Sequence, residues 1–213
     1  MKPRTLGVLL AGGRGKRLGA GLPKALVVCG GRTLIARALD TLEALCDAVV
    51  VVAPRELELP VPRAQRVDDP PGAAGPLAAM VTGLASRPFE EALVFAVDLP
   101  LVTPAALAAL RAWRGDALAV MAAPGDVPQP VAAWYASGAR APLATALEGG
   151  ERSLIAACRT LAPMLVGDAE LAAMPDGGGF QWNVNTFEDL ARAERLLGHT
   201  EPPHAAPGPG PRS

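Results

Sequence analysis

Residues 9–24 decide the fold, and they read LLAGGRGKRLGAGLPK. They overlap an apolar run, residues 6–11, whose length and composition predict a buried strand. Gly12 and Gly13 end this strand, because glycine permits backbone angles and close approaches that a Cβ would block. A strand that runs into such a loop exposes backbone N–H groups to an anion, as nests and helix N-termini do.

The same loop concentrates positive charge, carried by Arg14, Lys16, Arg17 and Lys24. Only three of the 20 Lys and Arg residues are lysines, and two of those three lie in this loop. Both side chains bind phosphate, lysine as a mobile point charge and arginine as a rigid fork, so the loop is predicted to hold a polyphosphate. The alternative is a solvated, glycine-rich surface turn. Neither GxxxxGK[ST] nor a properly spaced GxGxxG is present, which disfavours ordinary P-loop and Rossmann sites.

Length and composition limit the class of protein. A chain of 213 residues can bury the core of one α/β domain, which we expect over residues 1–197, with a disordered Pro- and Gly-rich tail over residues 198–213. The formal net charge of −1 argues against a broad basic surface for nucleic acid. No run reaches the roughly 18–20 apolar residues that a membrane helix needs, so we expect no membrane partner.

Cysteine and histidine restrict the chemistry. Cys29, Cys46 and Cys158 show no metal-binding spacing and are odd in number, which favours a reducing cytoplasm over a disulfide framework or a zinc site. His199 and His204 both lie in the expected tail. A Ser-His-Asp, Cys-His or His-metal site is therefore disfavoured, and we expect chemistry based on carboxylates, cations and a bound metal ion.

Alternating buried strands and amphipathic helices predict an α/β fold with a mostly parallel central sheet and helices on both faces. The expected strands are residues 6–11, 48–53, 92–97 and 131–135. The expected helices are residues 33–45, 75–84, 104–113, 141–147, 153–160 and 187–197, with Thr186 capping the last. Residues 115–129 and 167–179 are expected to be flexible loops.

Such sheets bind ligands beyond the carboxyl ends of their strands, so the glycine loop and Asp98 are expected to meet in one crevice. Asp98 ends a hydrophobic strand, where a carboxylate has no packing role. It suits a magnesium ion that bridges the protein to substrate phosphates, and the alternative is a turn residue before Pro100. Asp68 and Asp69 could orient a nucleotide or help to hold the metal, although an ordinary Asx-Pro turn is the simpler interpretation.

Three further segments are weaker candidates. Gly75, followed by Pro76, begins a helix whose N-terminus favours anions, although most such starts are merely structural. Asn183 and Asn185, on alternate residues, can face one ligand or form a capping turn. Gln129 could contact substrate, and Trp134, Tyr135 and Trp182 could line a pocket or pack in the core.

Taken together, these segments resemble the molybdenum cofactor guanylyltransferases, a branch of the MobA-like nucleotidyltransferases. The resemblance extends from Gly7 to Leu197. It is carried, in order, by Leu10-Ala11-Gly12-Gly13, Arg17-Leu18-Gly19, Lys24, Gly75-Pro76-Leu77-Ala78, Asp98-Leu99-Pro100, Gln129-Pro130 and Asn183-Val184-Asn185-Thr186. The opening and the lysine are shared widely among nucleotidyltransferases, whereas the last segment and Gly75-Pro76-Leu77-Ala78 favour this branch.

The resemblance implies a three-layer, Rossmann-like nucleotidyltransferase fold and an enzyme that transfers GMP from GTP to molybdopterin with Mg²⁺. The implied nucleotide-binding residues are Leu10, Ala11, Gly12, Gly13, Lys24, Asp69 and Asp98. Arg17 and Lys24 would hold the triphosphate, and Asp98 would bind the metal. Gly75, Asn183 and Asn185 would lie on the substrate side. The resemblance implies GTP and molybdopterin as the substrates. It is also compatible with transient contact with cofactor-biosynthesis or acceptor proteins.

Two positions depart from the branch. Pro23 precedes Lys24 where the branch often has Asp, and Ala53-Pro54 stands where it often has Asn. Both positions concern nucleotide selection, so a cytidylyl or sugar-phosphate nucleotidyltransferase is the alternative from the same class. A nucleotide-binding regulator without turnover is the alternative from a different class.

Overall fold

The computed structural model describes residues 4–13, 22–61, 63–68 and 75–198 of the chain. The expectations for Arg14, Lys16, Arg17 and Asp69 lie outside the described residues. The same holds for the expected tail after residue 198, which contains both histidines.

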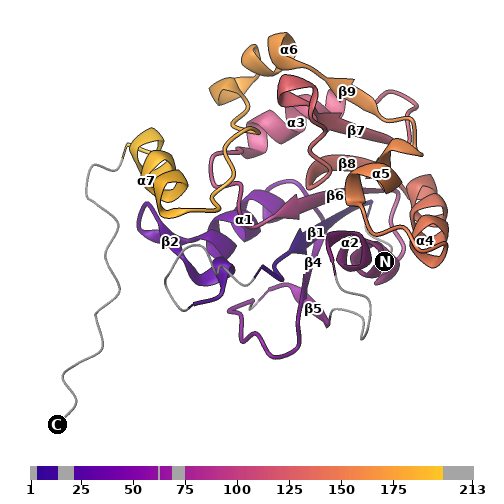
Figure 1. The fold of residues 1–213 in the computed structure, drawn as a ribbon, viewed down its shortest axis with the longest axis horizontal. Coiled ribbons are helices and arrows are strands. Elements are labelled where there is room, and N and C mark those ends of the chain that lie inside the picture. The colour runs from indigo at the N-terminus through magenta and orange to yellow at the C-terminus, as the bar shows by residue number, and fades with distance from the viewer. Residues whose placement is uncertain (1–3, 14–21, 62, 69–74, 199–213) are drawn as a thin grey trace.

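Seven strands form one central sheet in the order β5-β4-β1-β6-β8-β7-β9 (Figure 1). The neighbours from β5 to β6 are parallel, β8 is antiparallel to both β6 and β7, and β9 is parallel to β7. The expected mostly parallel sheet is therefore confirmed, with β8 as the exception. The strand bounds are β1 Thr5–Leu10, β4 Ala48–Ala53, β5 Gln65–Asp68, β6 Glu91–Ala96, β7 Ala119–Ala122, β8 Ala132–Ala136 and β9 Met164–Val166; a separate hairpin pairs β2 Val28–Cys29 with β3 Arg32–Thr33.

Helices cover both faces of the sheet, because successive strand residues point to opposite sides. Leu9 joins the core under α1, α3, α6 and α7, whereas Val8 and Leu10 join the core under α2, α4 and α5. This gives three layers, as expected. The helix bounds are α1 Leu34–Glu43, α2 Pro76–Ala85, α3 Pro104–Ala112, α4 Arg140–Glu148, α5 Leu154–Arg159, α6 Asp168–Ala172 and α7 Phe187–Leu196; 3₁₀ turns span η2 Lys24–Leu26, η3 Pro124–Asp126, η4 Ser137–Ala139 and η5 Pro175–Gly177.

The loop expectations were wrong in two places. Residues 115–129 contain β7 and η3, and residues 167–179 contain α6 and η5. Strands β5 and β9 were also not predicted. The four residues of β7 are all buried and thus show no alternation of polar and apolar residues, β5 is a partly exposed edge strand, and β9 has only three residues. Segments this short carry little periodic signal.

The aromatic residues proposed as pocket walls belong instead to the core in two cases. Trp134 and Tyr135 are fully buried on β8. Trp134 Nε1 donates a hydrogen bond to Leu107 O at 2.8 Å, and the Tyr135 hydroxyl donates one to Pro130 O at 2.8 Å. Trp182 is half-buried, with the Arg192 guanidinium 4.3 Å from its ring centroid. Of the two alternatives given for these rings, the core therefore holds for Trp134 and Tyr135, in line with the preference of large rings for burial.

Helix α2 lies so close to the sheet that only glycine fits at position 83. A Cβ on Gly83 would overlap Val8 Cγ1 on β1 and would lie 3.0 Å from Val52 Cγ2 on β4. This close packing fixes the position of α2, whose N-cap is Gly75, against the sheet.

We predict that Gly83→Ala lowers the free energy of unfolding by about 1–3 kcal/mol, because the added methyl group overpacks the interface. Chemical denaturation measures the change. Thr82→Ala, at the neighbouring position of the same helix, is the control and should stay within about 0.5 kcal/mol of the unsubstituted protein. Equal stability of the two variants would contradict the packing described.

Candidate active site at the carboxyl ends of the strands

The chain that leaves β1 forms the first wall of the site. Val97 N donates to Leu10 O at 3.4 Å, and Ala11 N donates to Val52 O at 2.9 Å, so β1 stays anchored between its two neighbours up to its last residue. Beyond this point, the backbone N–H groups of Gly12 and Gly13 donate to none of the described residues. Among the described residues these two N–H groups therefore have no acceptor, and their role in binding an anion stays a prediction.

Glycine at positions 12 and 13 was expected for two reasons, unusual backbone angles and close approaches that a Cβ would block. Neither Gly12 nor Gly13 has a positive φ, so the predicted need for unusual backbone angles was wrong. A Cβ on Gly13 would instead lie 3.4 Å from Cδ of Lys24, whose backbone N donates to Gly13 O at 3.2 Å. The lysine stem thus packs directly against Gly13, at an ordinary van der Waals distance for a Cβ.

Lys24, the first residue of η2, is the central side chain of the site. Its side chain is only 11% exposed, and its Nζ lies 2.8 Å from Asp98 Oδ2 and 2.7 Å from Asn185 Oδ1. These three residues come from the segment after β1, the segment after β6 and the segment before α7. The expected meeting of the glycine loop and Asp98 in one place is what the fold produces.

Asp98 presents one oxygen to Lys24 and keeps the other without a partner. Its Oδ1 is buried and accepts no hydrogen bond from the described residues. A buried carboxylate oxygen without a donor is costly, and a hard cation satisfies it well. No group of three or more His, Cys, Asp or Glu side chains in the described part of the chain could hold a metal. A cation at Asp98 would therefore need further ligands such as phosphate oxygens or water.

The other predicted residues are placed less centrally. Asn183 is half-buried, and the hydrogen bond to Lys24 comes from Asn185 instead. Gly75 is the exposed N-cap of α2, with φ +124°. Because α2 returns the chain from the end of β5 to the start of β6, Gly75 lies on the same edge of the sheet as Asp98. Asp68 ends β5, where its carboxylate lies 3.7 Å from the Arg66 guanidinium.

The role of Asp189 was missed. It lies in the first turn of α7. Its Oδ2 accepts hydrogen bonds from the backbone N of Asn185 and of Thr186, both at 2.9 Å. The sequence signal was the spacing of Thr186 and Asp189, which resembles a capping box with Asp in place of Glu.

A cavity of ≈ 550 Å³ continues the same edge toward β9. Strands β7 and β9 run in the same direction as β6, so their carboxyl ends lie on the Asp98 side of the sheet. Gln129, a predicted substrate contact, lines this cavity together with Gly125, Asp168, Leu171 and Gln181. The lining combines one carboxylate, two amides and apolar surface.

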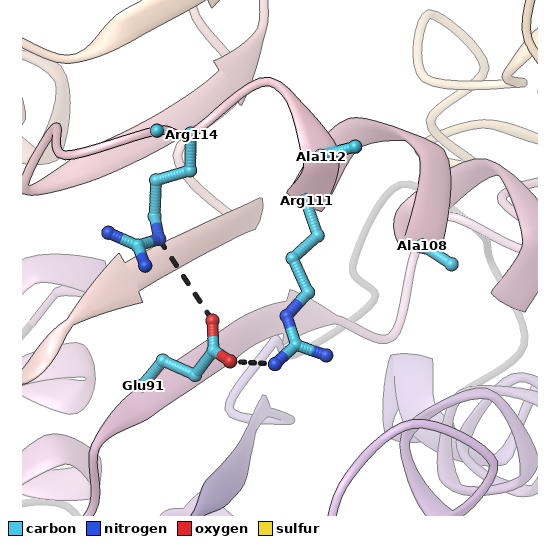
Figure 2. Close-up of a pocket in the computed structure, with 6 residues that line it drawn as sticks. Glu91, Ala108, Arg111, Ala112 and Arg114 are labelled. Carbon is cyan, nitrogen blue, oxygen red and sulfur yellow. Dashed lines mark hydrogen bonds and ion pairs between the residues drawn. The ribbon is translucent and has the colours of Figure 1, made fainter.

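A second cluster of charge lies at the opposite edge. Figure 2 shows the side chains of Arg111 and Arg114 converging on Glu91, the first residue of β6. The Arg111 guanidinium also lies 4.9 Å from the Trp134 ring centroid. Because Asp98 follows the other end of β6, this ion-pair cluster is separate from the site around Lys24.

The cysteines are poor candidates for nucleophiles. All three are free, and burial raises the pKa of the Cys29 and Cys158 thiols to about 11 and that of Cys46 to about 12. Thiols with such pKa values are almost entirely protonated near neutral pH. No helix among the described residues is long and apolar enough to cross a membrane.

A mostly parallel sheet with a glycine-ended strand and a buried lysine paired with an aspartate at one edge is the arrangement of a nucleotidyltransferase. A family model for the MobA-like NTP transferase domain matches residues 7–162. The chain belongs to this family.

Two relatives and one more distant fold match support the assignment. A protein of Chloroflexus aggregans named probable molybdenum cofactor guanylyltransferase is 36% identical over 201 residues, which cover 91% of this chain and 95% of that protein. The crystal structure of molybdopterin-guanine dinucleotide biosynthesis protein A from Archaeoglobus fulgidus has a TM-score of 0.71 and 26% identity, covering 91% of this chain and 98% of that one. The 2-C-methyl-D-erythritol 4-phosphate cytidylyltransferase of Thermus thermophilus, at 21% identity, a TM-score of 0.67 and coverage of 93% and 100%, shows the same fold.

We predict that Lys24→Ala and Asp98→Asn each lower kcat for nucleotidyl transfer by about 10²–10³, the usual effect of removing one preorganised charge-stabilising group. Steady-state kinetics measure the loss, and circular dichroism checks that each variant folds. Arg4→Ala is the matched control, because it removes an exposed cation, paired with Glu90 at 3.3 Å, from the start of β1. Full activity in either test variant would remove that residue from the site.

Proposed function

We propose that the protein transfers GMP from GTP to molybdopterin, releasing pyrophosphate and forming the molybdopterin guanine dinucleotide. The observation that carries the proposal is the buried Lys24 ammonium beside Asp98, in a chain that is 36% identical to a relative named for this activity along nearly its whole length. In the reaction, a terminal phosphate oxygen of molybdopterin attacks the α-phosphorus of GTP. The bond from the α-phosphorus to the bridging oxygen breaks, and pyrophosphate leaves with the electron pair.

This reaction asks little of an acid or a base, because the attacking phosphate is already ionised. Its main cost is to bring anions together in line, and fixed positive charge with precise alignment lowers that cost. Lys24 supplies charge between the two substrates, and the N–H groups of Gly12 and Gly13 supply donors to the triphosphate. Leu10 and Ala11 would contact the nucleoside. We assign Arg17 to the triphosphate and Asp69 to the nucleotide as well, on the resemblance alone.

We further propose Mg²⁺ as the divalent cation that this class of enzyme employs. The unpartnered, buried Oδ1 of Asp98 fits such a cation. When bound, the ion would neutralise charge on the phosphates and help to align them. The carboxylate of Asp98 would then serve two cations, with one oxygen on Lys24 and the other on the metal.

The acceptor is proposed to bind on the β8-β7-β9 side of Lys24. The cavity there is lined by Gln129, Asp168 and Gln181, whose oxygens can accept hydrogen bonds from an N–H-rich ring such as a pterin. Asn183 and Asn185 precede α7 on this side, and Gly75 would contact substrate at the N-terminus of α2. The nucleotide would occupy the other side, over β1, β4 and β5.

We propose that the enzyme acts in the cytoplasm, because its three free cysteines suit a reducing compartment. Transient contacts with proteins that supply molybdopterin or receive the product belong to the same proposal. We also propose that residues 1–197 form one domain.

The test is pyrophosphate release from each of the four nucleoside triphosphates, with Mg²⁺ and either molybdopterin or a panel of sugar phosphates. We predict that kcat/KM for GTP with molybdopterin exceeds that of every other pair by on the order of 10² or more, because a base-specific site leaves buried polar groups unpaired with the wrong base. Lys24→Ala serves as the background control.

Two results would overturn the assignment in different ways. Turnover with CTP but not GTP would favour the cytidylyl alternative, to which Pro23 and Ala53-Pro54 point. Nucleotide binding without pyrophosphate release, with any of the acceptors, would favour a regulator without turnover.

A further inference from the structure

The Lys24 ammonium has a defined number of hydrogen bonds to give. It carries three protons, and two of them are taken by Asp98 Oδ2 and Asn185 Oδ1. Counting the described residues, one proton is left for a substrate phosphate, and its direction depends on where the two protein acceptors lie. Asp98 follows the end of β6, and its backbone O accepts from Val184 N at 2.8 Å, which ties the residue before Asn185 to the Asp98 segment.

Asn185 itself belongs to no strand, and the bond of Val184 N to Asp98 O fixes only the residue before it. It is an exposed residue in the irregular segment before α7. Its backbone is held by Asp189, whose Oδ2 accepts from the N–H of Asn185 and of Thr186, both at 2.9 Å. Thr186 Oγ1 in return accepts from Asp189 N at 3.2 Å, which closes a reciprocal capping box. One carboxylate thus fixes the backbone of the residue that touches Lys24.

This arrangement exceeds what a helix needs for its cap. Helices α1, α3 and α5 are capped by Thr33, Thr103 and Ser153, each through a single hydroxyl bond to the third helical residue. In these three helices the third residue is Ala36, Ala106 and Ala156, so no carboxylate returns to the cap. Within the described part of the chain, the reciprocal cap occurs where the cap adjoins the active-site lysine.

Asp189 is also kept ionised. The hydrogen bond from the backbone of Asn185 lowers its pKa, with further lowering by Thr186 and by the charge of Lys24, and burial opposes these effects in part. Asp189 is therefore a full carboxylate at neutral pH. An ionised carboxylate accepts a stronger hydrogen bond than a neutral carboxyl group.

We propose that Asp189 is a positioning residue for nucleotidyl transfer: it holds the backbone of Asn185 so that the Asn185 amide oxygen fixes the Lys24 ammonium toward the substrate phosphates. The proposal rests on the proposed function. Asp189 itself touches neither substrate nor the reacting atoms, and acts through Asn185.

The first experiment is a double-mutant cycle on the full chain. We expect Asp189→Ala and Asn185→Ala each to lower kcat about tenfold, the effect of a loosened charge-stabilising group. The double variant should lose no more than Asn185→Ala alone, because both changes break the same chain of contacts. Asp189→Glu, which retains a carboxylate at the third position of the helix, should recover kcat to within about threefold of the unsubstituted protein.

Ser153→Ala is the matched control for helix capping. It removes a hydroxyl cap of the same 3.2 Å length from α5, which packs on the other face of the sheet. It should lower the melting temperature about as much as Asp189→Ala does, and it should leave kcat unchanged. Multiplicative losses in the cycle, or an equal loss of kcat in Ser153→Ala, would overturn the proposal.

The second experiment reads the geometry without substrate. The chain has only three lysines, Lys2, Lys16 and Lys24, so the side-chain ¹⁵Nζ and ¹³Cε signals of Lys24 can be assigned by substituting each lysine in turn. We expect Asp189→Ala to shift the Lys24 signals and Ser153→Ala to leave them in place. Unchanged Lys24 signals in Asp189→Ala would overturn the inference whatever the activity, whereas absence of transfer by the unsubstituted protein would overturn the proposed function alone.

Discussion

The contact between Lys24 Nζ and Asp98 Oδ2, 2.8 Å long and almost enclosed, is the interaction on which the site depends. An ammonium that is removed from water must be paired, or its burial costs several kcal/mol. Lys24 and Asp98 are 74 residues apart, so the pair forms only when η2 and the end of β6 meet. Asn185 adds a third segment, 161 residues beyond Lys24. The pair therefore forms only when the two halves of the chain have folded together around one edge of the sheet.

The sheet makes this assembly possible, because β1, β6, β7 and β9 all deliver their carboxyl ends to the same edge. The glycines after β1 leave their N–H groups open on one side of Lys24, and the cavity beside β7 and β9 lies on the other. The resulting order is backbone N–H donors, then fixed cation and carboxylate, then a cavity with amide and carboxylate lining. A transfer between two phosphates suits this order, since the charge of both converges at the middle.

Much of this could be predicted from the sequence, for identifiable reasons. Apolar runs such as residues 48–53 report buried strands directly, and Asp98 stands out because a carboxylate ends such a run. Strands β5, β7 and β9 could not be recognised, because segments of three or four residues have no usable period. The hydrogen bond of Asn185 to Lys24 and the support from Asp189 depend on how the segment before α7 crosses the sheet edge, which local patterns do not encode. The packing of the Lys24 stem against Gly13 is likewise a tertiary contact that local patterns do not encode.

The most direct test of the account is a crystal structure of the protein with Mg²⁺ and a GTP analogue that cannot be cleaved between the α- and β-phosphates. The account predicts the metal on Asp98 Oδ1, with the α-phosphate of the analogue within hydrogen-bond distance of Lys24 Nζ and the triphosphate over the N–H groups of Gly12 and Gly13. A triphosphate bound away from Lys24, or a metal held without Asp98, would contradict the central claim.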